Sequence, residues 1–168
     1  MASALVIMGV AGCGKSSLGQ AVATALSSRL VEGDDHHPAH NRDKMQRGLP
    51  LTDQDRDGWL QTLADILRQQ PSDLVLTCSA LKRHYRDRLR AAAPGLRFAF
   101  LALDRQAAAA RVAARADTHF FASSLVDSQF ATLESPTGEP GVLTLDALLP
   151  LNILSAQVQA WLATEICP

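Results

Sequence analysis

The sequence predicts an α/β fold in which a five-stranded parallel sheet is covered by helices on both faces. Short apolar runs alternate along the chain with longer segments whose apolar residues recur at helical spacing. A glycine-rich loop stands between the first apolar run and the first helical segment. The chain has 168 residues, of which 47% are hydrophobic and 20% charged, so we expect a single domain over residues 1–168.

Each expected strand is an apolar run bounded by polar or glycine-containing segments. In chain order, the expected strands are 4–8, 29–35, 73–80, 97–103 and 141–146. Strands that alternate with helices run parallel, and their carboxyl ends meet at one edge of the sheet, where ligands bind. The acidic end of the second strand and the small-residue end of the third should therefore face the glycine-rich loop.

The expected helices carry apolar stripes or helix-start signals. In chain order, they are 16–28, 52–70, 82–93, 104–116, 123–135 and 150–166. The second has Thr52 as a candidate N-cap with Asp55 three residues later, and Pro150 opens the last. Residues 36–50 are polar and rich in histidine, which makes them a poor core and a plausible site.

The glycine-rich loop "GVAGCGKSS" has the spacing of a backbone cradle for phosphate groups. Lys15 is expected to reach the β- and γ-phosphates of a nucleotide, and the Ser16 hydroxyl to bind Mg²⁺. The helix that follows adds the positive end of its dipole. The expected nucleotide contacts in the loop are Gly9, Val10, Ala11, Gly12, Cys13, Gly14, Lys15, Ser16 and Ser17.

Phosphoryl transfer also needs an acidic group at the acceptor and cations on the migrating phosphoryl group. Asp34, at the end of the second strand, is expected to accept the acceptor's proton or to hold a magnesium-bound water. Arg111 and Arg115 lie one helical turn apart, just before the polar, aromatic "ADTHFF". We expect both arginines to contact the nucleotide and Arg115 to act in catalysis. For each arginine, the alternative is a place on a solvated helix face. Residues 116–124 are expected to form a mobile lid.

Basic residues cluster in the helix expected at 82–93. Lys82 and Arg86 stand one turn apart near its start and are expected to hold a carboxylate of an anionic acceptor. For Arg88 and Arg90, a solvated helix face is the better interpretation. The third strand ends in "TCSA" without an aspartate, which disfavours a GTPase switch and favours a small-molecule kinase.

Composition disfavours several other classes of protein. A formal net charge of −1 does not favour a nucleic-acid or membrane partner. The three cysteines are far apart and outside any CxxC pair, which argues against a disulfide framework. With neither a signal-peptide pattern nor a membrane-length apolar run, we expect a cytoplasmic protein.

His36 and His40 have metal-pair spacing, but Pro38 would disturb a helix there, so hydrogen bonding to a polar acceptor is favoured over zinc.

Four segments, in order and across nearly the whole length, resemble gluconokinases of the small phosphate-loop type. They are "MGVAGCGKSS", "GDDHHPAHNRDKMQRGLPLTDQDRDGWL", "CSALKRHYRDRLR" and "HFFASSLVDSQFATLESP". A phosphate loop alone is shared by many proteins, whereas GD-x-x-HP-x-x-N-x-x-KM followed by CSALK-x-x-YRD is specific.

The resemblance implies a three-layer P-loop kinase fold of the nucleoside-monophosphate-kinase type with a mobile lid. It further implies phosphorylation of D-gluconate at its 6-hydroxyl by ATP with Mg²⁺, and a homodimer. The acceptor would bind at about residues 34–60, with Asp34 and His37 on its hydroxyls. Arg56, Lys82 and Arg86 are the candidates for its carboxylate.

Two segments depart from the family pattern. Between Arg115 and His119 the lid is one residue longer and includes Asp117, and only Asp146 and Pro150 are familiar in the adenine-side loop "DALLPL". Two alternatives stay open: a related kinase for shikimate or another sugar acid, and a nucleotide-binding regulator without turnover.

Overall fold

The computed structural model describes residues 3–115 and 124–164, and its centre is one parallel sheet. The sheet order is β2-β3-β1-β4-β5, and every neighbouring pair is parallel. The strands are β1 (Leu5–Met8), β2 (Arg29–Glu32), β3 (Leu74–Thr77), β4 (Arg97–Ala102) and β5 (Val142–Asp146). The predicted fold class and all five strands are confirmed.

The second strand is shorter than expected because the chain turns at Gly33. Residues Gly33–His36 form a short 3₁₀ helix, η1, in place of the last residues of the expected strand. A Cβ on Gly33 would lie 2.2 Å from the carbonyl oxygen of Thr77, so only glycine allows this close approach to β3. Asp34 therefore lies in this turn and not in the strand.

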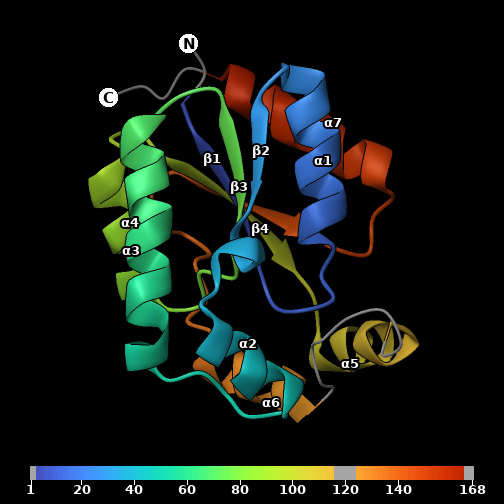
Figure 1. Ribbon diagram of the computed structural model, residues 1–168. Helices are drawn as coiled ribbons and strands as arrows, with labels where there is room; N and C mark the ends of the chain where they lie inside the picture. Colours follow the sequence, from blue (N-terminus) through green and yellow to red (C-terminus); the bar gives the residue numbers. More distant parts are fainter. Residues whose placement is uncertain (1–2, 116–123, 165–168) are drawn as a thin grey trace.

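The helices form two layers and a cap. They are α1 (Lys15–Leu26), α2 (Ala39–Gln46), α3 (Asp53–Gln69), α4 (Arg83–Ala92), α5 (Arg105–Ala114), α6 (Ser124–Thr132) and α7 (Leu151–Ala163). Figure 1 shows α3 and α4 on one face of the sheet, α1 and α7 on the other, and α2, α5 and α6 beyond one end of it. Among the described residues, no helix is long and apolar enough to cross a membrane.

Alternating residues of the central strand separate the two halves of the core. Val6 and Met8 pack into the cluster beneath α3 and α4, while Leu5 and Ile7 pack into the cluster beneath α1 and α7. All four side chains are at most 1% exposed. This burial on both faces explains why the strand is a continuous apolar run.

Helix α2 was not predicted, because one of the two side chains that it buries, Asn41, is polar. Asn41 and Met45 are buried four residues apart, and the remaining α2 residues are at least partly exposed. Pro38 precedes the helix as its N-cap residue and therefore does not interrupt it. The α3 start, in contrast, was predicted correctly: Thr52 and Asp55 form a reciprocal capping box.

Candidate active site

The loop between β1 and α1 has the backbone conformation that its glycines allow. Gly9, Gly12 and Gly14 have φ values of 149°, 81° and 98°, which favour glycine. The Lys15 ammonium group lies over this loop and donates to the carbonyl oxygens of Gly9, at 3.0 Å, and Val10, at 3.1 Å. The loop therefore holds Lys15 beside the backbone expected to bind phosphate.

A carboxylate that the sequence reasoning missed lies next to Ser16. Glu32, the last residue of β2, accepts hydrogen bonds at Oε2 from the Ser16 hydroxyl, at 3.0 Å, and from the Thr77 hydroxyl, at 2.5 Å. The predicted strand 29–35 placed Glu32 in its interior and Asp34 at its end, so only Asp34 was a candidate for this edge of the sheet. The structure brings three oxygen-bearing side chains from α1, β2 and β3 together.

An open cleft lies at the carboxyl ends of β1, β2 and β3. Its lining includes phosphate-loop residues, the turn after β2 and the ends of several helices. The lining residues are Ala11, Lys15, Asp34, His37, Met45, Pro50, Leu51, Arg56, Trp59, Ser79, Leu125, Ser128 and Gln129. The cleft thus joins the expected phosphate and acceptor regions.

Asp34 and His37 stand side by side in this cleft. The Nε2 atom of His37 lies 3.8 Å from Oδ1 of Asp34, whose side chain is 62% exposed. On its other side, the imidazole stacks on Trp59 with a ring-centroid separation of 4.2 Å. Burial lowers the pKa of His37 to about 4, because the attraction of Asp34 does not outweigh desolvation and the nearby Arg56 and Arg42. His37 is therefore neutral near pH 7.

The two basic candidates Arg56 and Lys82 have different surroundings. Arg56 is 8% exposed, lines the cleft, and donates through Nη1 to the carbonyl oxygen of Leu51 at 2.8 Å. Lys82 precedes α4, where its ammonium group pairs with Asp53 at 2.9 Å, and it does not line the cleft. The structure places Arg56, but not Lys82, on the wall that Asp34 and His37 share.

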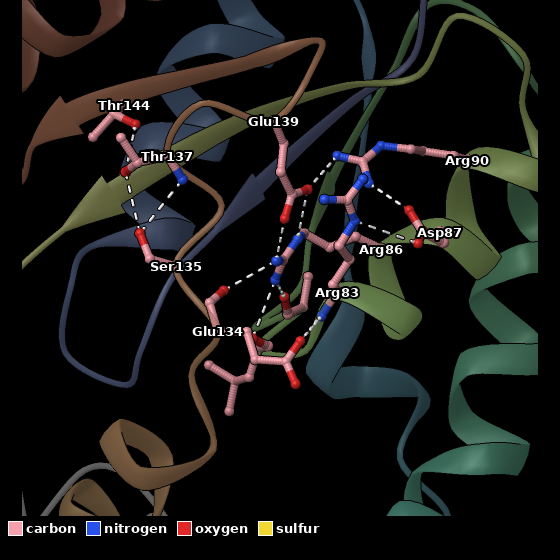
Figure 2. Close-up of polar contacts among 11 residues, drawn as sticks. Arg83, Arg86, Asp87, Arg90, Glu134, Ser135, Thr137, Glu139 and Thr144 are labelled. Carbon is pink, nitrogen blue, oxygen red and sulfur yellow. Dashed lines mark hydrogen bonds and ion pairs between the residues drawn. The ribbon is translucent and has the colours of Figure 1, made fainter.

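Arg86 lies in a buried polar cluster away from the cleft lining. Figure 2 shows Glu139 between Arg86 and Arg90, and Glu139 receives hydrogen bonds from Arg86 Nε and Nη2 and from Arg90 Nη2. Arg86 also donates to the carbonyl oxygens of Ala80, Leu81 and Glu134. With a fully buried side chain and these partners, Arg86 is placed to join α4 to the segment after α6, not to meet an acceptor.

The nucleotide-side arginines are only partly described. Arg111 reaches from α5 to the carbonyl oxygens of Gly12, at 3.2 Å, and Ala147, at 3.1 Å, and so spans the phosphate loop and the loop after β5. Arg115 follows α5 as its C-cap residue. Of the expected lid at 116–124, residues 116–123 lie outside the described residues, and Ser124 begins α6.

Helix α6 contributes a second group that sequence reasoning missed. Its Gln129 side chain accepts a hydrogen bond at Oε1 from the backbone N–H of Ala11, at 2.7 Å. Gln129 and Ser128 also line the cleft. Nothing in the sequence links α6 to the phosphate loop, because the two partners are 118 residues apart.

This fold, with a phosphate loop that opens into a cleft carrying charged side chains at the carboxyl ends of the strands, defines a small-molecule kinase of the P-loop type. Residues 5–139 match the family described as an AAA domain. The chain is 42% identical over 137 residues to the thermosensitive gluconokinase of Escherichia coli K12, which covers 80% of this chain and 73% of the relative.

It is also 41% identical over 151 residues to the thermoresistant gluconokinase of the same organism, covering 88% and 86% of the two chains. Among solved structures, a gluconokinase from Sinorhizobium meliloti 1021 has a TM-score of 0.87 and 44% identity, covering 96% of this chain and 91% of that one. The chain belongs to the gluconokinase family, and it is a phosphotransferase that uses an alcohol group as acceptor.

Proposed function

We propose that this protein transfers the γ-phosphoryl group of ATP to the 6-hydroxyl of D-gluconate, giving 6-phospho-D-gluconate and ADP. One observation carries the proposal: Lys15 of the phosphate loop, Asp34, His37 and Arg56 line a single cleft. The relatives named gluconokinase, with 41–42% identity over most of the chain, support the choice of acceptor.

Each group in the cleft suits one part of the transfer. Lys15 neutralises charge on the phosphoryl group while its bond to the β-phosphate breaks and its bond to the acceptor oxygen forms. Asp34 takes the proton that the acceptor hydroxyl loses, and His37 hydrogen-bonds the same end of the acceptor. Arg56 presents a guanidinium group to the carboxylate of gluconate, a pairing whose geometry favours arginine.

The residues beside the phosphate loop fit Mg²⁺, which prefers oxygen ligands. Ser16 would bind the ion, and Glu32, which accepts a hydrogen bond from Ser16, would contribute a carboxylate to its surroundings. When bound, Mg²⁺ neutralises phosphate charge. The homodimer and the cytoplasmic location stay predictions that rest on the family resemblance and on composition.

The proposed function is tested by measuring ADP release from Mg·ATP with gluconate, other sugar acids, shikimate and neutral hexoses as separate acceptors. We expect turnover with gluconate above all others. Turnover on another acid would keep the kinase assignment and change the acceptor, whereas nucleotide binding without product would support the regulator alternative.

A Lys15→Ala variant provides the control for the phosphate loop. We expect its kcat to fall on the order of 10²-fold or more, because a charge-stabilising group is lost in the transition state. The fold, checked by circular dichroism, should be unchanged. A folded variant with full activity would remove Lys15 from the mechanism.

A further inference from the structure

Asn41, in helix α2, is completely buried. Its Nδ2 atom lies 2.9 Å from the carbonyl oxygen of Asp55 and 3.2 Å from Nδ1 of His37. A carbonyl oxygen can only accept a hydrogen bond, so the atom facing Asp55 must be the amide nitrogen. The orientation of the Asn41 side chain is therefore determined by a backbone group.

This orientation also determines which nitrogen of His37 carries hydrogen. The amide nitrogen of Asn41 has two hydrogens and no lone pair to offer, so Nδ1 of His37 must be the acceptor. In a neutral imidazole the other nitrogen, Nε2, then carries the hydrogen. Nε2 is the atom that lies 3.8 Å from Asp34, and both residues line the cleft.

The surroundings of His37 hold the ring in this neutral form. Trp59 stacks on it with an angle of 16° between the ring planes. The charged groups facing the imidazole are Asp34 from η1, Arg42 from α2 and Arg56 from α3. A second hydrogen on Nδ1 would point at the donor group of Asn41, so the contact opposes protonation.

The amide nitrogen of Asn41 makes these two hydrogen bonds, but its amide oxygen has no hydrogen-bond partner among the described residues. Within residues 3–115 and 124–164, Oδ1 of Asn41 is one of two buried side-chain polar atoms without a hydrogen-bond partner. Buried polar groups in proteins are nearly always paired, and exceptions often mark functional positions. Both hydrogens of the Asn41 amide nitrogen are thus used in hydrogen bonds, whereas its oxygen accepts none from the described residues.

We propose that Asn41 is a positioning residue for phosphoryl transfer: it holds His37 in the tautomer with hydrogen on Nε2, so that His37 donates to an acceptor oxygen. His37 then cannot remove the acceptor's proton through Nε2. Among the described cleft residues, Asp34 is left as the group for that step, since Lys15 and Arg56 are cations. The tautomer follows from the fold alone, and its role in transfer rests on the proposed function.

The direct test is a two-bond ¹⁵N–¹H correlation spectrum of the protein labelled with ¹⁵N-histidine, recorded without ligands near pH 7. A His37→Gln variant assigns the His37 signals. We expect the Nδ1 shift of an unprotonated nitrogen and the Nε2 shift of a protonated one. The reverse pattern, or an average of the two tautomers, would overturn the proposal whether or not the protein phosphorylates gluconate.

An Asn41→Asp variant tests the consequence for binding. The carboxylate introduced at position 41 would accept a hydrogen bond from Nδ1 of His37 and favour the imidazolium, which raises the pKa of His37. As pH rises through that pKa, the ring keeps its hydrogen on Nδ1 and loses the one on Nε2. We expect the KM for gluconate to rise about tenfold to a hundredfold across that transition, while the KM for ATP stays constant. The unmodified protein should show no such transition between pH 6 and pH 9.

The matched control is Asp43→Asn, on the exposed side of the same helix, where Asp43 pairs only with Arg47 in the described chain. It should leave the KM for gluconate unchanged at every pH. An Asn41→Asp variant whose KM is raised equally at all pH values would indicate a merely structural residue and overturn the proposal. If Asn41→Asp does not fold, the spectrum of the unmodified protein still decides the tautomer.

Discussion

Arg56 brings a nearly buried guanidinium group to the cleft without an acidic side chain as its ion-pair partner among the described residues. Its described hydrogen bonds go to the Leu51 carbonyl and, at 3.4 Å, to the Tyr85 hydroxyl. A cation in a desolvated position gains more from an anionic ligand than one already neutralised. By this reasoning Arg56, of the basic candidates, is best suited to the acceptor's carboxylate.

We therefore expect Arg56→Gln to raise the KM for gluconate about tenfold to a hundredfold, with little change in the KM for ATP. Lys82→Gln should have a smaller effect, because Lys82 forms a partly exposed pair with Asp53. Steady-state kinetics with each substrate varied in turn makes the comparison. Equal increases for gluconate and ATP in the Arg56 variant would contradict carboxylate recognition.

Among the elements, the polar cluster around Glu139 joins helix α4 to the segment between α6 and β5. No strand pairing connects these two parts of the chain. Arg86 and Glu139 are 53 residues apart, and their side chains are 0% and 7% exposed. Burial disfavours the charged form of Glu139, but hydrogen bonds from Arg86 and Arg90 outweigh it and hold its pKa below the ordinary value. The cluster fixes the loop after β3, which carries Ser79 of the cleft, against the segment that follows α6.

Arg86→Met should lower the free energy of unfolding by about 3–5 kcal/mol, because it leaves Glu139 buried beside only one cation. Adding Glu139→Gln should recover part of the loss, since the unpaired charge is then removed. Urea denaturation of the two variants and the unmodified protein measures both effects. A stable Arg86→Met protein with a raised KM for gluconate would instead restore the carboxylate role that the sequence suggested.

At the scale of the whole molecule, the pH dependence of stability reflects groups that the fold buries or pairs. Burial lowers the pKa of His37 from 6.5 to about 4, so the unfolded chain binds the extra proton between these values. Hydrogen bonds, first from Lys44, lower the pKa of Asp55 from 3.8 to about 2. The stabilisation that the Asp55 carboxylate contributes is present above pH 3.8 and is lost as pH falls toward 2.

The free energy of unfolding should accordingly decrease as pH falls from about 6.5 to about 4, and decrease again below pH 4. Urea midpoints at closely spaced pH values test this. A His37→Gln variant should lose the first decrease and keep the second. Retention of the first decrease in that variant would show that another group titrates there.

Much of the fold was predictable from local patterns. Each strand is a short apolar run because a parallel sheet buries both faces, and the capping box at Thr52 signals the start of α3 within four residues of sequence. Helix α2 escaped prediction because Asn41 occupies a position where helices usually bury an apolar side chain. Its amide nitrogen meets the two acceptors, on His37 and Asp55, only once the chain has folded.

The fold class, the phosphate loop and the family resemblance could all be read from the chain, because they depend on residue types at fixed spacing. Which charged groups line the cleft depends on how the chain folds. Arg56 and Arg86 look alike in sequence, yet Glu139 neutralises one and no described carboxylate neutralises the other. The difference arises because ion pairing depends on distance in space, and residues 53 positions apart carry no local signal that they will meet.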